Sequence, residues 1–293
     1  MTTTTHTPLT MLVCCHKADV MATQAPYLPI QVGKALATAD LGIQGDNTGN
    51  NISLKNPSYC ELTGMYWAWK NLNPQPPLIG LCHYRRYFDF HHQCRPARPF
   101  DVFPSAAFPS LNLTVPQSVI NKIKPGTAVV NRPWYYTYSI FFDYCSCHIS
   151  TDFKTMAKVV KETQPKTMRR AFYRIMYCNN ALMPANMFIM TWHDFDEYCS
   201  FLFPILAQVE SQTDISHYNP VQRRVFGFLA ERLFNVWLYA RHMHLIRPPM
   251  IWVSDEDIQV PTPLHRQQVR LRGWLSTKIS NPRTHDLAEM KFK

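Results

Sequence analysis

Short apolar runs alternate with longer amphipathic segments along the chain. Each run is bounded by glycine, proline or polar residues, which predicts short buried strands. The runs lie at residues 11–15, 78–82, 127–131, 186–190, 244–246 and 251–253.

The amphipathic segments have the spacing of helices. Apolar side chains recur at helical intervals from Leu62 to Trp69, with Ser58 as the predicted N-cap and Pro74 beyond the end. Residues 91–117 are rich in proline and are expected to be irregular. Alternating strands and helices predict an α/β fold. Further helical patterns cover residues 152–177 with a break at Pro165, residues 194–211 and residues 221–240.

The composition is that of a globular protein. Hydrophobic residues make up 46% of the chain and charged residues only 17%, which excludes a disordered chain. No uninterrupted apolar run approaches about eighteen residues, so no transmembrane helix is expected. Residues 1–6 lack the charged and apolar regions of a signal peptide, which predicts a cytoplasmic protein.

The formal net charge of +10 favours an anionic partner, such as a nucleic acid, an acidic membrane surface or a phosphorylated ligand. No recognition helix, zinc finger or RNA-binding motif is present, so no nucleic-acid partner is predicted. The last thirty residues are the most basic, and apolar residues are interleaved there, which predicts either a peripheral membrane contact or a solvated surface. These residues are Arg266, Val269, Arg270, Leu271, Arg272, Trp274, Lys278, Arg283, Lys291 and Lys293.

The nine cysteines are scattered, and most lie in apolar runs. This pattern favours reduced, buried thiols over a disulfide framework. A zinc site is the alternative, because Cys145, Cys147 and His148 lie close together in the sequence, as do His91, His92 and Cys94. Neither segment has the paired C-x2-C spacing of structural zinc modules, and no metal ligand is predicted.

The densest group of hydrogen-bond donors follows the buried run at residues 78–82. Arg85 and Arg86 are flanked there by His83, Tyr84 and Tyr87. Guanidinium groups bind phosphate oxygens in a bidentate manner, and ligands of open α/β sheets bind at the carboxyl ends of strands. The segment is therefore a candidate phosphate-binding site, with a solvated surface loop as the alternative.

Two other polar segments are candidate ligand contacts. His16 and Lys17 follow the first predicted strand and would add positive charge near a phosphate. The turn-rich segment after residue 45 offers carboxylate, amide and hydroxyl groups to a ribose or a sugar, although a plain loop has the same composition. Its candidates are Asp46, Asn47, Thr48 and Asn51.

Acidic residues supply candidates for acid–base chemistry. Glu231 lies beside Arg232 in an otherwise apolar helix. It is either a functional carboxylate or one partner of a structural ion pair. Asp194 and Asp196 form the Asp-x-Asp pattern of metal-dependent glycosyltransferases, but acidic residues are also favoured at a helix start. Asn186 begins a buried run, where it is expected either to contact a ligand or to cap the end of the strand.

Seven segments in order along the chain resemble the bacterial capsular and exopolysaccharide glycosyltransferases catalogued as domain of unknown function 4422. The resemblance covers roughly residues 11 to 240. One departure is Cys14-Cys15-His16-Lys17, where relatives often have Ala-Thr-His-Lys. The matching segments are residues 30–36, 45–53, 66–71, 80–88, 186–190, 195–199 and 227–237.

This resemblance implies a GT-A-like, Rossmann-related mixed sheet flanked by helices. It further implies a hexosyltransferase that moves a sugar, galactofuranose in some members, from a UDP-sugar to a growing surface polysaccharide with inversion. The acceptor is a polysaccharide or a lipid-linked glycan. We expect residues 1–250 to form this domain, and residues 251–293 to form a basic extension that packs on it or contacts the inner face of the cytoplasmic membrane.

Within that mechanism, a base deprotonates the acceptor while the leaving diphosphate gathers negative charge. Because no Asp-x-Asp follows the central strand, we expect His83, Arg85 and Arg86 to replace part of a metal's role. No cofactor is predicted, and Mn²⁺ or Mg²⁺ is the alternative.

The predicted base is Glu231, with Asp46 and Asp194 as reserves. Donor contacts are predicted at His16, Lys17, Asp46, Asn47, Thr48, Asn51, His83, Tyr84, Arg85 and Arg86. Acceptor or sugar contacts are predicted at Tyr66, Trp69, Tyr87, Asn186 and Arg232, although core packing explains the two helical aromatics equally well. The competing functions are a carbohydrate- or nucleotide-binding protein without catalysis and a basic nucleic-acid-binding protein.

Overall fold

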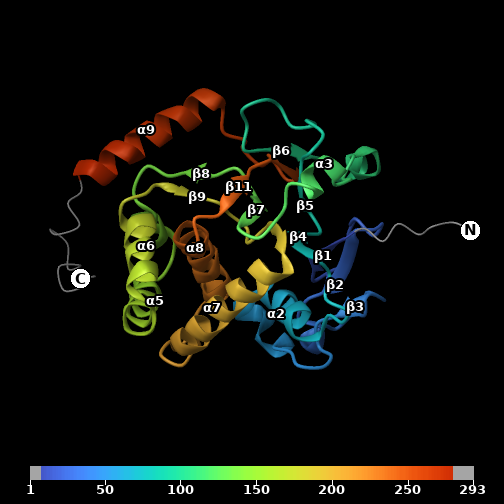
Figure 1. The fold of residues 1–293 in the computed structure, drawn as a ribbon, viewed down its shortest axis with the longest axis horizontal. Coiled ribbons are helices and arrows are strands. Elements are labelled where there is room, and N and C mark those ends of the chain that lie inside the picture. The colour runs from blue at the N-terminus through green and yellow to red at the C-terminus, as the bar shows by residue number, and fades with distance from the viewer. Residues whose placement is uncertain (1–7, 280–293) are drawn as a thin grey trace, which may run out of the picture. The chain divides into compact units, whose positions relative to one another are not determined.

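The computed structural model describes residues 8–279 and divides into two compact units (Figure 1). Unit 1 takes the chain up to Arg132, then Asn186–Cys199 and His244–Val260. Unit 2 takes Pro133–Ala185, Ser200–Met243 and the chain from Pro261 on. Within residues 8–279, no helix is both long and apolar enough to cross a membrane.

Unit 1 is built on a ten-stranded mixed sheet whose main path runs β11-β7-β10-β4-β1-β2-β3. The side chains of β1, β7 and β10 are almost entirely buried, as their apolar sequences predicted. The strands are β1 (Leu9–Cys15), β2 (Tyr27–Gln31), β3 (Gln44–Gly45), β4 (Leu78–His83), β5 (Arg86–Phe88), β6 (Phe100–Phe103), β7 (Thr127–Val130), β10 (Phe188–Thr191), β11 (His244–Ile246) and β12 (Met250–Val253).

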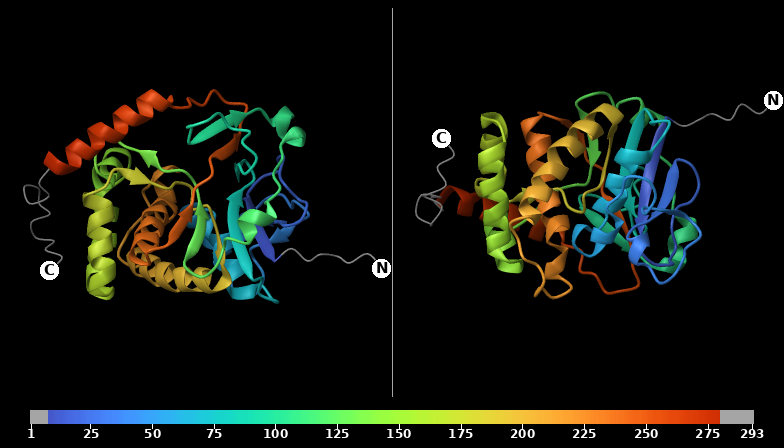
Figure 2. Two further views of the ribbon diagram at one scale, coloured as in Figure 1. Left: turned by 45° about the horizontal axis from the view of Figure 1, so that its top comes forward. Right: turned by 90° about the horizontal axis from the view of Figure 1, so that it is seen from below.

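Strands β1, β2, β3 and β4 are parallel, so their carboxyl ends meet at one edge of the sheet (Figures 1 and 2). Strand β10 lies between β4 and β7 in the sheet and is antiparallel to both. After β4 the chain turns back into β5, which pairs with β12, and β12 in turn pairs with β6. This hairpin places the residues that follow β4 at the same edge as the ends of β1 and β3.

Helix α2 (Leu62–Asn71) packs closely on the sheet of unit 1. A Cβ atom built on Gly64 would lie 2.8 Å from Val32 Cγ1 and 3.3 Å from Cys14 Sγ, so only glycine permits this approach. The predicted N-cap was wrong, because Ser58 lies inside the preceding helix α1 (Asn56–Tyr59) and its hydroxyl donates to the Lys55 carbonyl. The other short helices of unit 1 are η1 (Lys34–Leu36), η2 (Ser53–Lys55), η3 (Ser105–Ser110) and α3 (Gln117–Ile120).

Unit 2 is mainly helical, and its core is aromatic. Phe141, Tyr144, Phe153 and Tyr177 are buried and form edge-on or tilted ring pairs with centroids 5.1–6.2 Å apart. Each such ring contributes about 1.5–3 kcal/mol by leaving water. The elements are β8 (Trp134–Tyr135), α4 (Ile140–Cys147), α5 (Ser150–Thr163), α6 (Lys166–Tyr177), β9 (Ala181–Leu182), η4 (Gln222–Arg224), α8 (Val225–Ala240) and α9 (Pro263–Ile279). Helix α7 (Trp192–Glu210) runs from unit 1 into unit 2.

The predicted α/β class, a mixed sheet with flanking helices, is confirmed. All six predicted strands are present, and the break at Pro165 separates α5 from α6 as expected. The expectation of an irregular segment at residues 91–117 was wrong in part, because it contains β6 and η3. Strand β12 spans the predicted boundary between residue 250 and the C-terminal extension expected from residue 251, and the chain stays in unit 1 up to Val260.

Candidate functional site

Polar side chains gather at the carboxyl edge of β1–β4 in unit 1. His16 and Lys17 follow β1 and are exposed, and Asp46 follows β3. Tyr84 and Arg85 form the two-residue turn between β4 and β5. The rings of His16 and Tyr84 lie edge to face at 5.6 Å, and the Tyr84 amide donates to the Cys14 carbonyl at 3.2 Å. The structure thus brings the segments after β1 and β4 together.

The strand register aligns His83, Arg86 and Trp252 on one face of the sheet. His83 pairs with both Cys14 and Arg86, and Arg86 pairs with Trp252 of β12. The Arg86 guanidinium lies over the Trp252 ring, with its carbon 4.5 Å from the ring centroid. Stacking of this kind orients a guanidinium group while leaving its charge intact. Arg86 is therefore fixed by a residue 166 positions later in the chain.

The Arg85 guanidinium is fixed by an ion pair with Asp19. Its Nε and Nη2 atoms lie 2.9 and 2.7 Å from the same carboxylate oxygen. Both side chains are largely shielded from solvent, and they belong to the segments that follow β4 and β1. The pair ties these two segments together and holds the cation at the sheet edge.

Tyr87 was predicted to contact sugar, and the structure buries it completely. Its hydroxyl accepts a hydrogen bond from the Ala22 amide at 3.0 Å and donates to the Tyr84 carbonyl at 2.9 Å. The ring packs against Tyr27 and Phe108, with centroids 5.8 Å apart in both cases. Strand alternation puts Tyr87 on the face opposite Arg86. Tyr87 therefore influences the carboxyl edge only by holding the segments that contain Ala22 and Tyr84 in place.

Asp46 is buried and organises the loops that follow β2 and β3. Its carboxylate accepts hydrogen bonds from the Gly33 amide at 2.8 Å, the Lys34 amide at 3.0 Å and the Ser53 hydroxyl. Because both oxygens are engaged, Asp46 has the contacts of a loop anchor.

The residues after Asp46 run along α2. Asn47 is exposed and its side-chain oxygen folds over Gly45. The Thr48 hydroxyl accepts from Trp67 Nε1 at 2.8 Å, and Asn51 Nδ2 donates to the Gly49 carbonyl at 3.0 Å. These contacts lead the segment away from the carboxyl edge and along the helix.

Asn186 lies at the carboxyl edge, just before β10. Its Nδ2 donates to Glu61 Oε1 at 2.7 Å, and Glu61 stands at the start of α2. The Glu61 carbonyl also accepts from the Cys14 thiol at 3.8 Å. Asn186 has a φ of 49°, in the left-handed region that asparagine tolerates better than most residues. The start of α2 and the start of β10 are thus joined beside His83.

Tyr66, Trp69 and Asp194 are not brought to this edge. Helix α2 ends near the start of β4, so Tyr66 and Trp69 lie toward the opposite edge of the sheet, where Trp69 Nε1 donates to Asp196 at 2.7 Å. Asp194 is buried in the first turn of α7 and accepts hydrogen bonds from the Thr191 hydroxyl at 2.7 Å and from the Gly126 amide at 3.1 Å. Thr191 caps the helix, because its hydroxyl oxygen accepts from the Asp194 amide at 3.1 Å.

Unit 2 contains a second candidate group around Glu231 and Arg232 on α8. Arg232 is buried, with 5% of its side chain exposed, and its Nη1 lies 3.0 Å from Glu231 Oε2. The other Glu231 oxygen accepts from the Ala185 amide at 2.8 Å. Asp143 of α4 lies 3.8 Å from Arg232 Nη2, and the Arg232 guanidinium lies over the Tyr144 ring at 5.1 Å. The buried guanidinium group of Arg232 is thus close to two carboxylates, those of Glu231 and Asp143.

Burial changes the protonation of this group. It raises the pKa of Asp143 from 3.8 to about 6, with Arg232 opposing the rise and Glu231 adding to it. Burial, together with Arg232, lowers the pKa of His148 to about 4, so its ring is neutral at neutral pH. The neutral ring stacks on Phe228 at 4.1 Å. Asp143 therefore exchanges its proton close to neutral pH, as acid–base chemistry requires.

In the candidate zinc segment at residues 91–94, Cys94 and His91 make other contacts. The Cys94 thiol donates to the Met250 carbonyl at 3.4 Å, and the His91 ring contacts Thr114 at 2.9 Å. Among residues 8–279, no group of three or more His, Cys, Asp or Glu side chains is placed to hold a metal ion. All nine cysteines are free thiols, and burial raises the pKa of Cys14 and Cys82 above the ordinary value.

Sequence reasoning missed Asp19, Glu61, Asp143 and Trp252. Asp19 and Arg85 are 66 positions apart, and no local spacing links them. Trp252 lies in a predicted strand, but its pairing with Arg86 depends on sheet register. For Asp143 the available signal was its place within an aromatic run, after Phe141 and Phe142 and before Tyr144.

Comparison with known proteins gives one family and one solved structure. The family model described as "Domain of unknown function (DUF4422)" matches residues 10–242. The chain is similar to the apo structure of the bifunctional glycosyltransferase WbbM, with a TM-score of 0.75 and 27% sequence identity over 85% of this chain and 46% of that chain. This chain thus spans about half the length of the chain it matches. No curated protein matches it.

Proposed function

The chain belongs to the family described as domain of unknown function DUF4422, and from this premise we propose that it is a glycosyltransferase. The similarity to WbbM supports this reaction class. In more detail, we propose a cytoplasmic hexosyltransferase with a UDP-sugar donor and, as acceptor, a hydroxyl of a growing bacterial surface polysaccharide, free or lipid-linked. Galactofuranose is the donor sugar to test first, with inversion at its anomeric carbon.

The turn between β4 and β5 is the observation that carries this proposal. It follows a buried strand and presents His83 with two guanidinium groups, each held by a partner: Asp19 holds Arg85, and Trp252 holds Arg86. Cations fixed before the reaction stabilise developing charge without having to reorganise. A departing nucleoside diphosphate is an anion of this kind, and arginine matches its oxygens.

In the proposed reaction, the acceptor oxygen attacks the anomeric carbon while the bond from that carbon to the diphosphate oxygen breaks. The electron pair of the broken bond goes to the diphosphate, where His83, Arg85 and Arg86 stabilise it. The acceptor proton goes to a carboxylate. Because one displacement occurs, the anomeric configuration inverts.

For the carboxylate we keep Glu231 as the first candidate and add Asp143. Glu231 is held by the Ala185 amide and by Arg232, which orients its oxygens. Asp143 shares Arg232 and has a pKa raised to about 6 by burial, which suits proton transfer near neutral pH. The two carboxylates are separated by testing the variants Glu231→Gln and Asp143→Asn individually.

The deciding experiment is a donor screen with the full chain. UDP-sugars, including UDP-galactofuranose, are incubated with and without a lipid-linked glycan acceptor, and UDP and the extended acceptor are followed by mass spectrometry. We expect UDP release that depends on the acceptor. Tight donor binding without transfer, over the whole panel, would instead indicate a binding protein and contradict the proposal.

A matched pair of arginine variants tests the site. Arg86→Ala should lower turnover strongly, whereas Arg95→Ala, an exposed arginine of the same unit, should leave it unchanged. The metal-independent form of the mechanism predicts full activity in EDTA. Complete loss of activity in EDTA, restored by Mn²⁺, would show that a metal shares the role assigned to the arginines.

A further inference from the structure

Helix α9 packs on the rest of unit 2 through one face only. Gly273 is buried there, and a Cβ atom built on it would lie 2.2 Å from the Tyr136 carbonyl oxygen. Asn180 Nδ2 donates to the Arg270 carbonyl at 3.3 Å, and Arg266 Nη2 donates to the Pro133 carbonyl at 3.0 Å. These contacts hold α9 on the segment that contains β8.

The opposite face of α9 exposes a stripe of leucines. Leu264, Leu271 and Leu275 are 67%, 58% and 44% exposed, and Trp274 beside them is 52% exposed. With 3.6 residues per turn, the three leucines fall within an arc of about 40°, centred opposite Gly273. The helix therefore packs on the rest of unit 2 through the face at Gly273 and leaves an apolar stripe exposed on the opposite face.

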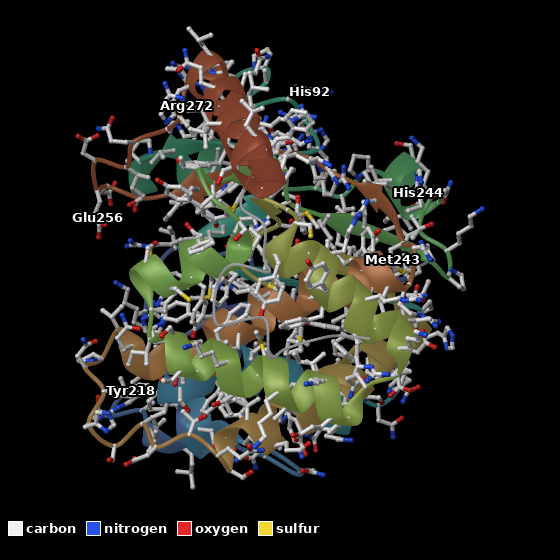
Figure 3. All side chains as sticks on the ribbon, turned by 90° about the vertical axis from the view of Figure 1, so that its left-hand side faces the viewer. His92, Tyr218, Met243, His244, Glu256 and Arg272 are labelled. Atoms are coloured by element: carbon white, nitrogen blue, oxygen red, sulfur yellow. The ribbon has the colours of Figure 1, made fainter. Side chains whose placement is uncertain are left out.

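The exposed stripe has basic and no acidic neighbours on its own helix. No Asp or Glu occurs from Pro263 to Ile279. Arg272 and Lys278 are exposed on the two sides of the leucines, and Arg272 is labelled on α9 in Figure 3. The basic residues Arg283, Lys291 and Lys293 predicted for the same surface lie outside the described residues.

We propose that α9 docks on the surface of a lipid bilayer that contains anionic lipids. The leucine stripe and Trp274 enter the boundary between headgroups and acyl chains, and Arg272 and Lys278 pair with lipid phosphates. The helix has 17 residues, about 25 Å, and lies in the plane of the membrane. This interaction would hold the protein beside any lipid-linked acceptor, but it does not depend on catalysis.

The charge pattern favours a lipid surface over a second copy of the chain. Two stripes packed against each other would bring the arginines and lysines of both helices close together without any acidic residue of α9 to pair with them. An anionic membrane supplies the missing negative charge. Trp274 at the border of the stripe has the amphipathic side chain that is enriched at membrane interfaces.

Vesicle flotation with the full chain tests the proposal. Phosphatidylcholine vesicles with and without phosphatidylglycerol are compared at low and high salt. We expect binding to the anionic vesicles that weakens with salt. Leu264→Gln, Leu271→Gln and Leu275→Gln combined should weaken it on the order of a hundredfold, and Arg272→Gln with Lys278→Gln about thirtyfold.

The control is Leu54→Gln, the same change at a leucine of unit 1 that is 68% exposed; it should bind vesicles like the wild type. Circular dichroism confirms that the triple variant is folded, which is expected because its side chains point away from β8. Equal vesicle binding by the triple variant and the wild type would overturn the proposal. The proposal would also be overturned if the wild type bound no vesicles and light scattering showed it to be a dimer that the triple variant does not form.

Discussion

Asp143 makes the stability of the protein depend on pH in a defined direction. Burial raises the pKa of its carboxyl from 3.8 to about 6, so the folded state binds this proton more tightly than the unfolded chain. Between these two values the folded protein carries more protons, and stability must therefore fall as pH rises. Above about pH 6 the loss is complete, because the carboxyl is ionised in both states.

The magnitude follows from the size of the change. At about 1.4 kcal/mol for each pH unit, the rise to about 6 corresponds to about 3 kcal/mol. The Asp143 side chain is 19% exposed, and solvent screening reduces the figure to about 2–3 kcal/mol. Asp143→Asn removes this titration. The difference in free energy of unfolding, variant minus wild type, should therefore increase by about 2–3 kcal/mol as the pH is raised from about 4 to about 8.

Urea unfolding of both proteins, followed by circular dichroism across this pH range, measures the difference. The variant also exchanges a carboxyl for an amide, which shifts the stability by an amount nearly constant with pH. The pH-dependent pairing with Arg232 is already contained in the pKa of Asp143, so the slope of the stability difference against pH is the quantity to compare. Asp214→Asn is the control: hydrogen bonds from Ser216 lower the pKa of Asp214, and its difference should run in the opposite direction. Parallel curves for wild type and Asp143→Asn would refute the reasoning.

Three further predictions concern the proposed reaction and the loops beside it. Arg85→Ala should lower kcat by about 10²–10³, measured as UDP release with saturating donor and acceptor; a loss of less than about tenfold would remove Arg85 from the leaving-group site. Glu231→Gln should keep donor affinity, measured by calorimetry, and lose transfer, so an unchanged rate would end its role as the base. Tyr87→Phe leaves the Ala22 amide and the Tyr84 carbonyl without their buried partner; we expect a loss of about 1–2 kcal/mol in urea unfolding and a raised donor KM, and a stability equal to wild type would show that water replaces the hydroxyl.

The fold could be predicted where burial alone decides the residue types. Strands β1, β4, β7 and β10 are covered on both faces and appear in the sequence as apolar runs. Strand β2 was not predicted, because Pro29 interrupts its pattern and its first three residues are only half-buried. Helix α4 was missed because it is short and mostly apolar, without the polar face that marks a surface helix.

The candidate site could be predicted only as far as strand ends reveal it. Position after a buried strand identified His83 to Arg86 and the residues after β1. Which face each side chain takes and which distant residue holds it depend on sheet register, as for Arg86 on Trp252. For Asp194 the sequence left two interpretations open, an Asp-x-Asp pattern and a helix start, and its hydrogen bonds from Thr191 and Gly126 are those of a structural residue in the first turn of α7.

The two-residue turn between β4 and β5 has a consequence for how this protein can change in evolution. Adjacent residues of a strand point to opposite faces, so the turn length alone sends Arg86 to one face and Tyr87 to the other. Inserting or deleting one residue would exchange them, burying a guanidinium group and exposing a tyrosine ring. Substitutions at Tyr84 and Arg85 leave this allocation intact. Selection should therefore act on the length of this turn more strictly than on its composition.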